Sequence, residues 1–338
     1  MTFSLNEPLI NILAIESSCD DTAAAVLQNG DILSNVVAGQ KVHEQYGGVV
    51  PELASRAHQQ HIVPVVDVAL QKAGIKKEEL SAIAFTSGPG LIGSLMVGTS
   101  FAKSMALALN IPLIGINHMQ AHVLAHFIDD PKPTFPFLCL TVSGGHTMIT
   151  IMHDHFTGEV IGHTTDDAAG EAFDKAAKIL GLPYPGGPLI DQYAKEGNPK
   201  AFAFPKPNIP DLNYSFSGLK TAYLYFVQNH TKENPDFVQQ HLADICASIQ
   251  HSIIAHLMKK LILASEQTGI RQIAIAGGVS ANSGLREAIY REGEKRGWQV
   301  YIPDFQYCTD NAAMIAIAGY HKFLKKAFDN QEISPYAR

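Results

Sequence analysis

The sequence predicts an α/β protein built from two similar halves. Its 338 residues are 46% hydrophobic and 17% charged, which is the composition of a chain that buries a large core. The order strand, polar turn, strand, strand and then helices occurs twice, once from residue 11 and again from residue 137. A proline-rich stretch at residues 129–136 separates the two repeats and is typical of a linker.

The first half contains an alternation of strands and helices. Alternating and apolar runs predict strands at residues 11–16, 23–28, 32–37, 82–86 and 111–116. Asn29-Gly30 is a hairpin signal between two of these strands. One helix should run from Pro51 to Ala73, kinked or broken at Pro64. Another helix is expected at residues 91–109. Lys103 interrupts its apolar run, which argues against a membrane span and for packing in the protein.

The second half repeats this plan. Strands are expected at residues 137–142, 146–152, 159–164 and 273–276, and long helical stretches near 166–175 and 235–268. Asp166, Asp167 and Glu171 suit the first turn of a helix. Residues 198–213 are rich in proline and phenylalanine without a regular pattern, which predicts a mobile flap or a partner-docking segment. We expect a first lobe at 1–130, completed by a helix at about 311–328, and a second lobe at 131–310.

Three histidines at four-residue spacing follow the strand at residues 111–116. Helix positions four apart share one face, so His118 and His122 can direct two imidazole nitrogens at one point. Ordinary surface histidines are the alternative, but ligands of open α/β sheets lie beyond the carboxyl ends of strands. Met119 replaces the glutamate of the zinc-protease motif H-E-x-x-H, which disfavours that chemistry. His126 lies a further turn along and is expected outside the ligand set.

Two polar turns occupy corresponding places in the two halves. The turn at residues 16–22 carries hydroxyls and acids, including Asp20, and the turn at residues 141–147 carries Ser143-Gly144-Gly145. Backbone amides and carboxylates in such turns can contact a phosphate group or its metal ion. A plain hairpin turn is the alternative for each.

Four later polar residues are candidates for a functional role, and two of them also suit a helix N-cap. Asp174 lies too deep in its helix to be a cap, and Asp191 lies on a helix after a rigid Pro-Gly turn. Asn282 follows a strand and a double glycine, as in nucleotide-binding turns, but it also suits a helix N-cap. Asp310 precedes the last helix and is either an N-cap or a carboxylate ligand.

Charge and cysteine content give little sign of a partner or a disulfide scaffold. The net charge of −7 does not predict nucleic-acid binding by the chain as a whole, so a local patch or a partner protein would have to supply that attraction. Cys19, Cys139, Cys246 and Cys308 form no C-x-x-C pair. The first basic residue is Lys41, and we therefore expect no signal peptide and a cytoplasmic protein.

Seven motifs together resemble the tRNA N6-adenosine threonylcarbamoyltransferase family, formerly labelled O-sialoglycoprotein endopeptidase, within the actin, sugar-kinase and Hsp70 ATPase superfamily. They lie at residues 15–22, 117–122, 142–147, 167–174, 216–221, 276–282 and 309–314. The resemblance covers residues 12–319 and implies a duplicated, actin-like (ribonuclease H-like) two-lobe fold with a nucleotide between the lobes. Asp21 departs from the glutamate that many relatives have, which puts a direct role for it in doubt.

The resemblance also implies the site residues. His118, His122 and Asp310 match the metal ligands of the family, Asp20 matches an acid implicated in turnover, and the matching substrate contacts are Thr141, Val142, Ser143, Gly144, Gly145, Asp174, Gly187, Asp191 and Asn282. The implied cofactor is one divalent metal ion per subunit, Fe(2+) in the first place and Zn(2+) as the alternative.

The implied reaction transfers a threonylcarbamoyl group from threonylcarbamoyl-AMP to the N6 amine of the adenosine beside the anticodon, in tRNAs that read codons starting with A. The implied partners are tRNA, a paralogous actin-like protein and a small P-loop ATPase, without a membrane. Two rivals on the same fold remain: a small-metabolite kinase that uses ATP, and a noncatalytic scaffold. A scaffold would be expected to lack one of His118, His122 and Asp310, whereas all three are present.

Overall fold

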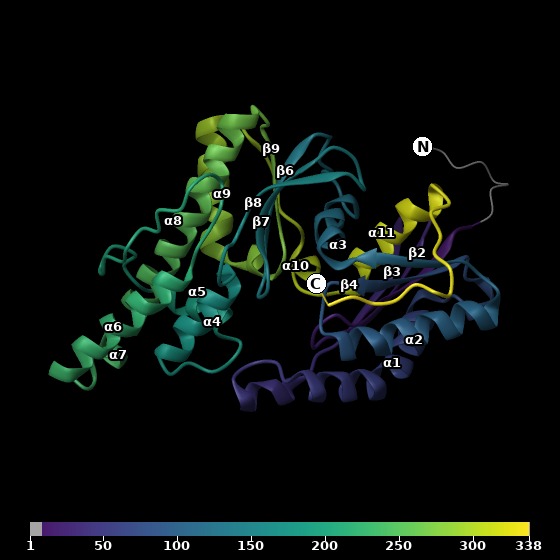
Figure 1. Ribbon diagram of the computed structural model, residues 1–338, viewed down its shortest axis with the longest axis horizontal. Coiled ribbons are helices and arrows are strands. Elements are labelled where there is room, and N and C mark those ends of the chain that lie inside the picture. The colour runs from purple at the N-terminus through teal and green to yellow at the C-terminus, as the bar shows by residue number, and fades with distance from the viewer. Residues whose placement is uncertain (1–8, 338) are drawn as a thin grey trace. The chain divides into compact units, whose positions relative to one another are not determined.

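The computed structural model describes residues 9–337, which form two compact units. Unit 1 consists of Met1–Lys41, Val49–Lys132 and Asp310–Arg338, and unit 2 consists of Val42–Gly48 and Pro133–Thr309. Each unit holds a mixed five-stranded sheet with helices packed on it (Figure 1). The predicted α/β class with two lobes is confirmed.

The sheet of unit 1 has the strand order β3-β2-β1-β4-β5. Its strands are β1 (Asn11–Glu16), β2 (Thr22–Gln28), β3 (Asp31–Ala38), β4 (Ala82–Gly88) and β5 (Leu113–Asn117). The first three form an antiparallel meander, and β4 and β5 run parallel to β1. Asn29-Gly30 forms the predicted hairpin turn, where Asn29 has a φ of 52°.

Helices cover both faces of this sheet: α1 (Pro51–Ala73) and α2 (Ile92–Leu109) on one, α3 (His118–Leu124) and α11 (Ala312–Leu324) on the other (Figure 1). Leu13 and Ile15 of β1 belong to the core beneath α1 and α2. Since strand side chains alternate between faces, Glu16 points to the opposite face, where α3 packs against α11.

Helix α1 is not broken at Pro64, so of the two outcomes expected there, a kink or a break, the break is wrong. Helix α1 continues through Pro64 to Ala73 and ends at Gly74, which has a left-handed φ of 67°. Ile62 and Val65 flank the proline and are buried against the sheet. This packing outweighs the hydrogen bond that proline cannot donate.

Helix α2 is the one helix within residues 9–337 whose length and hydropathy would suit a membrane span. It packs against α1 and β4 in unit 1, and helices of protein cores meet the same criteria.

The sheet of unit 2 repeats the plan of unit 1 with the order β10-β9-β6-β7-β8. Its strands are β6 (Phe137–Val142), β7 (Thr147–Met152), β8 (Gly158–His163), β9 (Gln272–Ala276) and β10 (Gln299–Tyr301). Again the first three are antiparallel, and the last two run parallel to the first. The duplication predicted from the pattern of elements is therefore present at the level of strand order.

Helices pack around this second sheet and its core (Figure 1). They are α4 (Ala169–Ile179), α5 (Gly186–Ala194), α6 (Ser217–Glu233), α7 (Phe237–Gln240), α8 (Leu242–Thr268), α9 (Ser283–Arg296) and α10 (Phe305–Cys308). The predicted helical stretch at 235–268 is thus two helices, α7 and α8.

Of the three acids expected in the first turn of α4, Glu171 lies there, whereas the expectation is wrong for Asp166 and Asp167, which precede the helix. The Asp166 carboxylate instead accepts hydrogen bonds from Phe216 N at 2.8 Å and from Ser217 Oγ at 2.7 Å. It therefore organises the start of α6, which is distant in sequence. Burial alone would raise the pKa of Asp166, but these hydrogen bonds outweigh it and lower the pKa.

Candidate metal centre and substrate-binding loops

Helix α3 begins at the first candidate ligand. β5 ends at Asn117, whose side-chain oxygen accepts a hydrogen bond from Gln120 N and caps the helix. The cap fixes where the helix starts, and therefore which way His118 and His122 point. Their rings are edge to face with centroids 4.7 Å apart, and their Nε2 atoms are 3.2 Å apart.

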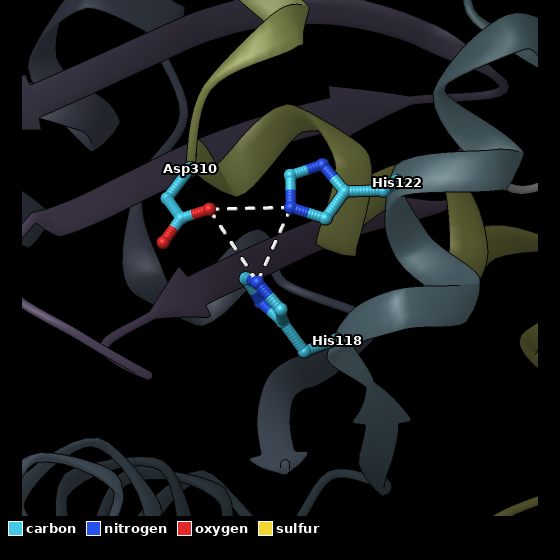
Figure 2. Close-up of side chains that lie close together, drawn as sticks. All are labelled: His118, His122 and Asp310. Carbon is cyan, nitrogen blue, oxygen red and sulfur yellow. Dashed lines mark hydrogen bonds and ion pairs between the residues drawn. The ribbon is translucent and has the colours of Figure 1, made fainter. Parts of the chain in front are cut away.

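Asp310 reaches the same point from the other end of the chain. Asn311, not Asp310, caps α11 by accepting from Met314 N, so the Asp310 carboxylate is not used as a cap. Its Oδ1 lies 3.2 Å from His122 Nε2 and 3.4 Å from His118 Nε2 (Figure 2). The predicted convergence of these three side chains is present, and all three belong to unit 1.

The triangle of donor atoms suits a divalent transition metal. Bonds of about 2.0–2.1 Å at tetrahedral angles place ligand atoms about 3.3 Å apart. The three observed separations are 3.2, 3.2 and 3.4 Å. Two imidazoles and one carboxylate are a donor set that both Fe(2+) and Zn(2+) accept. The residues present therefore fit the implied metal ion.

The surrounding charges favour a cation at this point. Burial would raise the pKa of Asp310, but His118 and His122 outweigh burial and hold that pKa well below its usual range. Burial would lower the pKa of His118, but Asp310 and the buried Glu16 raise it well above the ordinary value. The same pocket that stabilises a proton on His118 would stabilise a metal ion in its place.

The turn that carries Asp20 lies beside these ligands. Ser18 Oγ is 3.2 Å from His118 Nδ1, and Ser18 O accepts a hydrogen bond from Leu91 N. Burial, followed by the charges of Asp20, Asp310 and Glu16, raises the pKa of Asp21 to about 7. Asp21 therefore lies within the electrostatic reach of both Asp20 and the candidate ligand Asp310.

His58 fixes this turn and was missed from the sequence. It is fully buried in α1, with Nε2 3.0 Å from Cys19 O and Nδ1 2.7 Å from Thr22 Oγ1. The carbonyl can only accept, so Nε2 donates to it and Nδ1 accepts from the threonine hydroxyl. Nothing in the local pattern around His58 marks it as a loop anchor, because both partners lie in a different segment of the chain.

Unit 2 collects the predicted substrate residues at several loop ends. Thr141 and Val142 end β6 and are buried, whereas Gly144 and Gly145 are exposed in the following turn. A Cβ on either glycine would meet nothing within 4 Å. Protein packing therefore leaves the space over this turn open to a ligand.

Two tight contacts hold that turn in place. Gly170 N donates to Ser143 O, and a Cβ on Gly170 would lie 2.6 Å from the same oxygen. Gly277 has a φ of 84°, and a Cβ there would lie 2.5 Å from Val142 O. Both positions need glycine because the turn passes too close for a side chain.

The remaining predicted contacts already have partners within unit 2. Asp174 Oδ1 accepts from Gly186 N at 2.8 Å and from Gly187 N at 3.2 Å, and thus holds the start of α5. Burial raises the pKa of Asp174, although these hydrogen bonds oppose the rise. Asp174 and Gly186 also line a cavity of about 300 Å³.

Asp191 and Asn282 lie next to each other. Asp191 accepts from Ser283 Oγ at 2.7 Å, while Asn282 caps α9 and donates to Gln250 Oε1 at 2.7 Å. The structural role considered for Asn282 is therefore present, and a contact of Asn282 with a substrate would be additional to it.

Comparison with known proteins agrees with this arrangement. A family model described as tRNA N6-adenosine threonylcarbamoyltransferase matches residues 31–317. A protein of that name from Christiangramia forsetii is 67% identical over 337 residues, with 99% of each chain covered. Another, from Cytophaga hutchinsonii, is 62% identical over 329 residues, which cover 97% of this chain and 96% of the relative.

Solved structures at low identity support the fold alone. HypF from T. kodakarensis has a TM-score of 0.60 at 13% identity over 97% of this chain and 50% of its own. Component A of the (R)-2-hydroxyglutaryl-CoA dehydratase from Acidaminococcus fermentans has a TM-score of 0.54 at 15% identity over 93% and 98%. These are actin-like folds, as predicted. By the family match and by identity over nearly its full length, the chain belongs to the tRNA N6-adenosine threonylcarbamoyltransferase family of tRNA-modifying transferases.

Proposed function

We propose that this protein transfers the threonylcarbamoyl group from threonylcarbamoyl-AMP to the N6 amine of the adenosine adjacent to the anticodon, in tRNAs reading codons that start with A. The observation that carries this proposal is the convergence of His118, His122 and Asp310 in a chain of this family. A small-metabolite kinase would not need that triangle, and a scaffold would not need to keep it.

The metal ion would be held by His118 Nε2, His122 Nε2 and Asp310 Oδ1. Fe(2+) is the proposed ion, with Zn(2+) as the alternative that metal analysis distinguishes. When bound, it supplies positive charge for the phosphate and carbamoyl oxygens of the donor.

The residues of the chain would then act as follows. The adenosine amine attacks the carbamoyl carbon, a C–N bond forms, and the bond from that carbon to the phosphate oxygen breaks so that AMP leaves with the electron pair. Asp20 orients the amine or accepts its proton. The turn of Thr141, Val142, Ser143, Gly144 and Gly145 contacts the donor, and Asp174, Gly187, Asp191 and Asn282 bind its nucleoside part.

We propose three further features that family membership supports. We propose a paralogous actin-like protein and a small P-loop ATPase as partners, since the chain's net charge of −7 makes help with tRNA binding useful. We also propose a cytoplasmic location, where tRNA is available.

The test combines metal analysis with a transfer assay. Purified protein, threonylcarbamoyl-AMP and tRNA are mixed with and without the partners, and modified adenosine is measured by mass spectrometry. His118→Ala and His122→Ala should each lose most bound metal and reduce transfer by at least about 100-fold while the protein stays folded. The matched control is His251→Ala, which removes an exposed histidine of α8 and should change neither reading. Transfer at the wild-type rate by a metal-free variant would refute the proposed role of the triangle.

A further inference from the structure

A fully buried carboxylate lies behind one of the two histidines. Glu16 is the last residue of β1 and is 0% exposed. Its Oε2 is 3.1 Å from His118 Nδ1 and accepts a hydrogen bond from Thr86 Oγ1 at 2.5 Å. Its Oε1 accepts from Ser18 N at 2.5 Å. The carboxylate is therefore held by groups from β4 and from the turn after β1, and one of its oxygens faces the imidazole.

This contact decides which nitrogen of His118 carries hydrogen. A carboxylate oxygen that already accepts from Thr86 can only accept, so Nδ1 of His118 must donate to it. Nε2 is then free of hydrogen in the neutral ring, and its lone pair points toward His122 and Asp310. A carboxylate that binds the far nitrogen of a ligating histidine both orients the ring and makes it a stronger ligand.

The second histidine has no such support within residues 9–337. Nδ1 of His122 is buried and makes no hydrogen bond to the described part of the chain. The ring of His122 is therefore placed by packing within α3 and against its neighbours. Of these two rings, His118 alone is oriented by a hydrogen bond at Nδ1 from the described part of the chain.

A purely structural role does not account for Glu16. Ile12 and Ala14 precede Glu16 on the same face of β1, and both are apolar and fully buried. Burying a carboxylate on such a face is costly unless it is paired. The imidazole of His118 supplies that pairing.

We propose that Glu16 is a positioning residue that fixes the tautomer and the ring plane of His118 and thereby sets the affinity of the site for a divalent metal ion. The inference rests on the proposed metal-binding function of His118, His122 and Asp310. It assigns to Glu16 no contact with the substrate or with the metal ion.

Glu16→Gln tests the proposal because it preserves the size of the side chain. The amide can turn its NH₂ group toward Nδ1 of His118, which favours the opposite tautomer with hydrogen on Nε2. The dissociation constant of the full-length protein for Zn(2+), measured by competition with a chelator, should rise by about 10- to 100-fold. In the zinc-loaded wild type, ¹⁵N-labelled histidine spectra should show Nδ1 of His118 protonated, and this signal should shift or disappear in Glu16→Gln.

Two further variants separate position from charge. Glu16→Asp keeps the charge but withdraws the carboxylate by about one carbon–carbon bond, so it should also weaken zinc binding. Asp21→Asn removes an acid from the neighbouring turn that makes no hydrogen bond to either histidine within the described structure, and it should weaken binding much less. If Asp21→Asn weakens binding as much as Glu16→Gln, the effect is general electrostatics and the positioning role is wrong.

The outcomes also distinguish this inference from the proposed function. A wild-type protein that fails to bind zinc or iron would overturn the metal site itself. A wild type that binds metal, with Glu16→Gln and Glu16→Asp binding equally well and an unchanged His118 signal, would overturn only the role of Glu16. Circular dichroism of each variant checks that the comparison is made between folded proteins.

Discussion

At the scale of single residues, local patterns revealed the histidines but not the groups that hold them. His118 and His122 were predictable because helix geometry alone brings positions four apart onto one face. Asp310 lies 188 residues from His122, and from its local sequence it suited an N-cap equally well. Only the resemblance to a family paired it with the histidines. The contacts of Glu16 with His118 and of His58 with Cys19 were missed, because hydrogen bonds between segments distant in sequence produce no recognisable local pattern.

The buried His256 gives a prediction about pH. It is 4% exposed in α8, and burial, then the charges of Lys260 and Lys259, lower its pKa to about 4, against a smaller opposing effect of Asp166. The folded state therefore favours the neutral ring. This contribution is complete above pH 6.5, the ordinary pKa, and is lost as the pH falls from 6.5 to about 4.

We expect the free energy of unfolding to fall by about 3 kcal/mol from this source over that range. Urea unfolding at pH 7, 5.5 and 4.5 measures the fall, and His256→Gln, which cannot titrate there, should show a shallower decline than the wild type. Parallel declines in the two proteins would show that His256 does not contribute to the pH dependence.

At the scale of elements, the expected strands match the structure to within two residues, whereas β10 (Gln299–Tyr301) was not expected. The expected starts of α1 and α2 match to within a residue, but that of α4 does not. Short apolar runs mark buried strands locally, as in Asn11–Glu16 and Phe137–Val142, which match the expected bounds. The start of α4 was placed too early, because Asp166 looks like a first-turn acid but holds the start of α6. Acids at a helix start and acids that cap a distant helix have the same local sequence.

The C-terminal segment at residues 329–337 pairs with the edge of the sheet in unit 1, an element that no sequence pattern indicated. Asp329 N donates to Leu113 O at 2.8 Å, and the Asp329 carboxylate accepts from Gly115 N at 2.7 Å. Farther along, the hydroxyl of Tyr336 accepts from Asn117 Nδ2 at 2.8 Å. Since Asn117 caps α3, the segment supports the strand and the cap that precede His118.

Asp329→Ala should therefore lower the free energy of unfolding by about 1–2 kcal/mol, because Gly115 N loses a charged acceptor at a partly buried site. Denaturant unfolding measures the loss, and amide exchange at Gly115 should become faster. Asp329→Asn keeps an acceptor oxygen and is the matched control, with a smaller expected loss. An unchanged exchange rate at Gly115 in Asp329→Ala would show that the segment does not hold β5.

At the scale of the whole molecule, the duplicated plan was predictable because each half repeats the same order of elements. No repeated pattern accompanies the C-terminal segment Asp310–Arg338, which returns to unit 1 after all of unit 2. Helix α11 is apolar and buried from Ala312 to Gly319, which shows that it packs in a core but not in which one. Its placement follows from close contacts such as that of Gly319 with Ala84, which local patterns do not reveal.

This chain order makes metal binding a link between distant parts of unit 1. The proposed ligands come from α3 and from Asp310, which lies two residues before α11, so a bound ion would tie the middle of the chain to its C-terminal segment within one unit. A ligand that binds only the folded state stabilises it by about 2.7 kcal/mol at 100 times its dissociation constant. Hydrogen exchange read by mass spectrometry should then show slower exchange on addition of Zn(2+) in peptides from β1, α3 and α11, with little change in β6, β7 and β9 of unit 2. Asp310→Ala should abolish that protection, and protection that persists in this variant, or that spreads equally over both sheets, would contradict a metal site confined to unit 1.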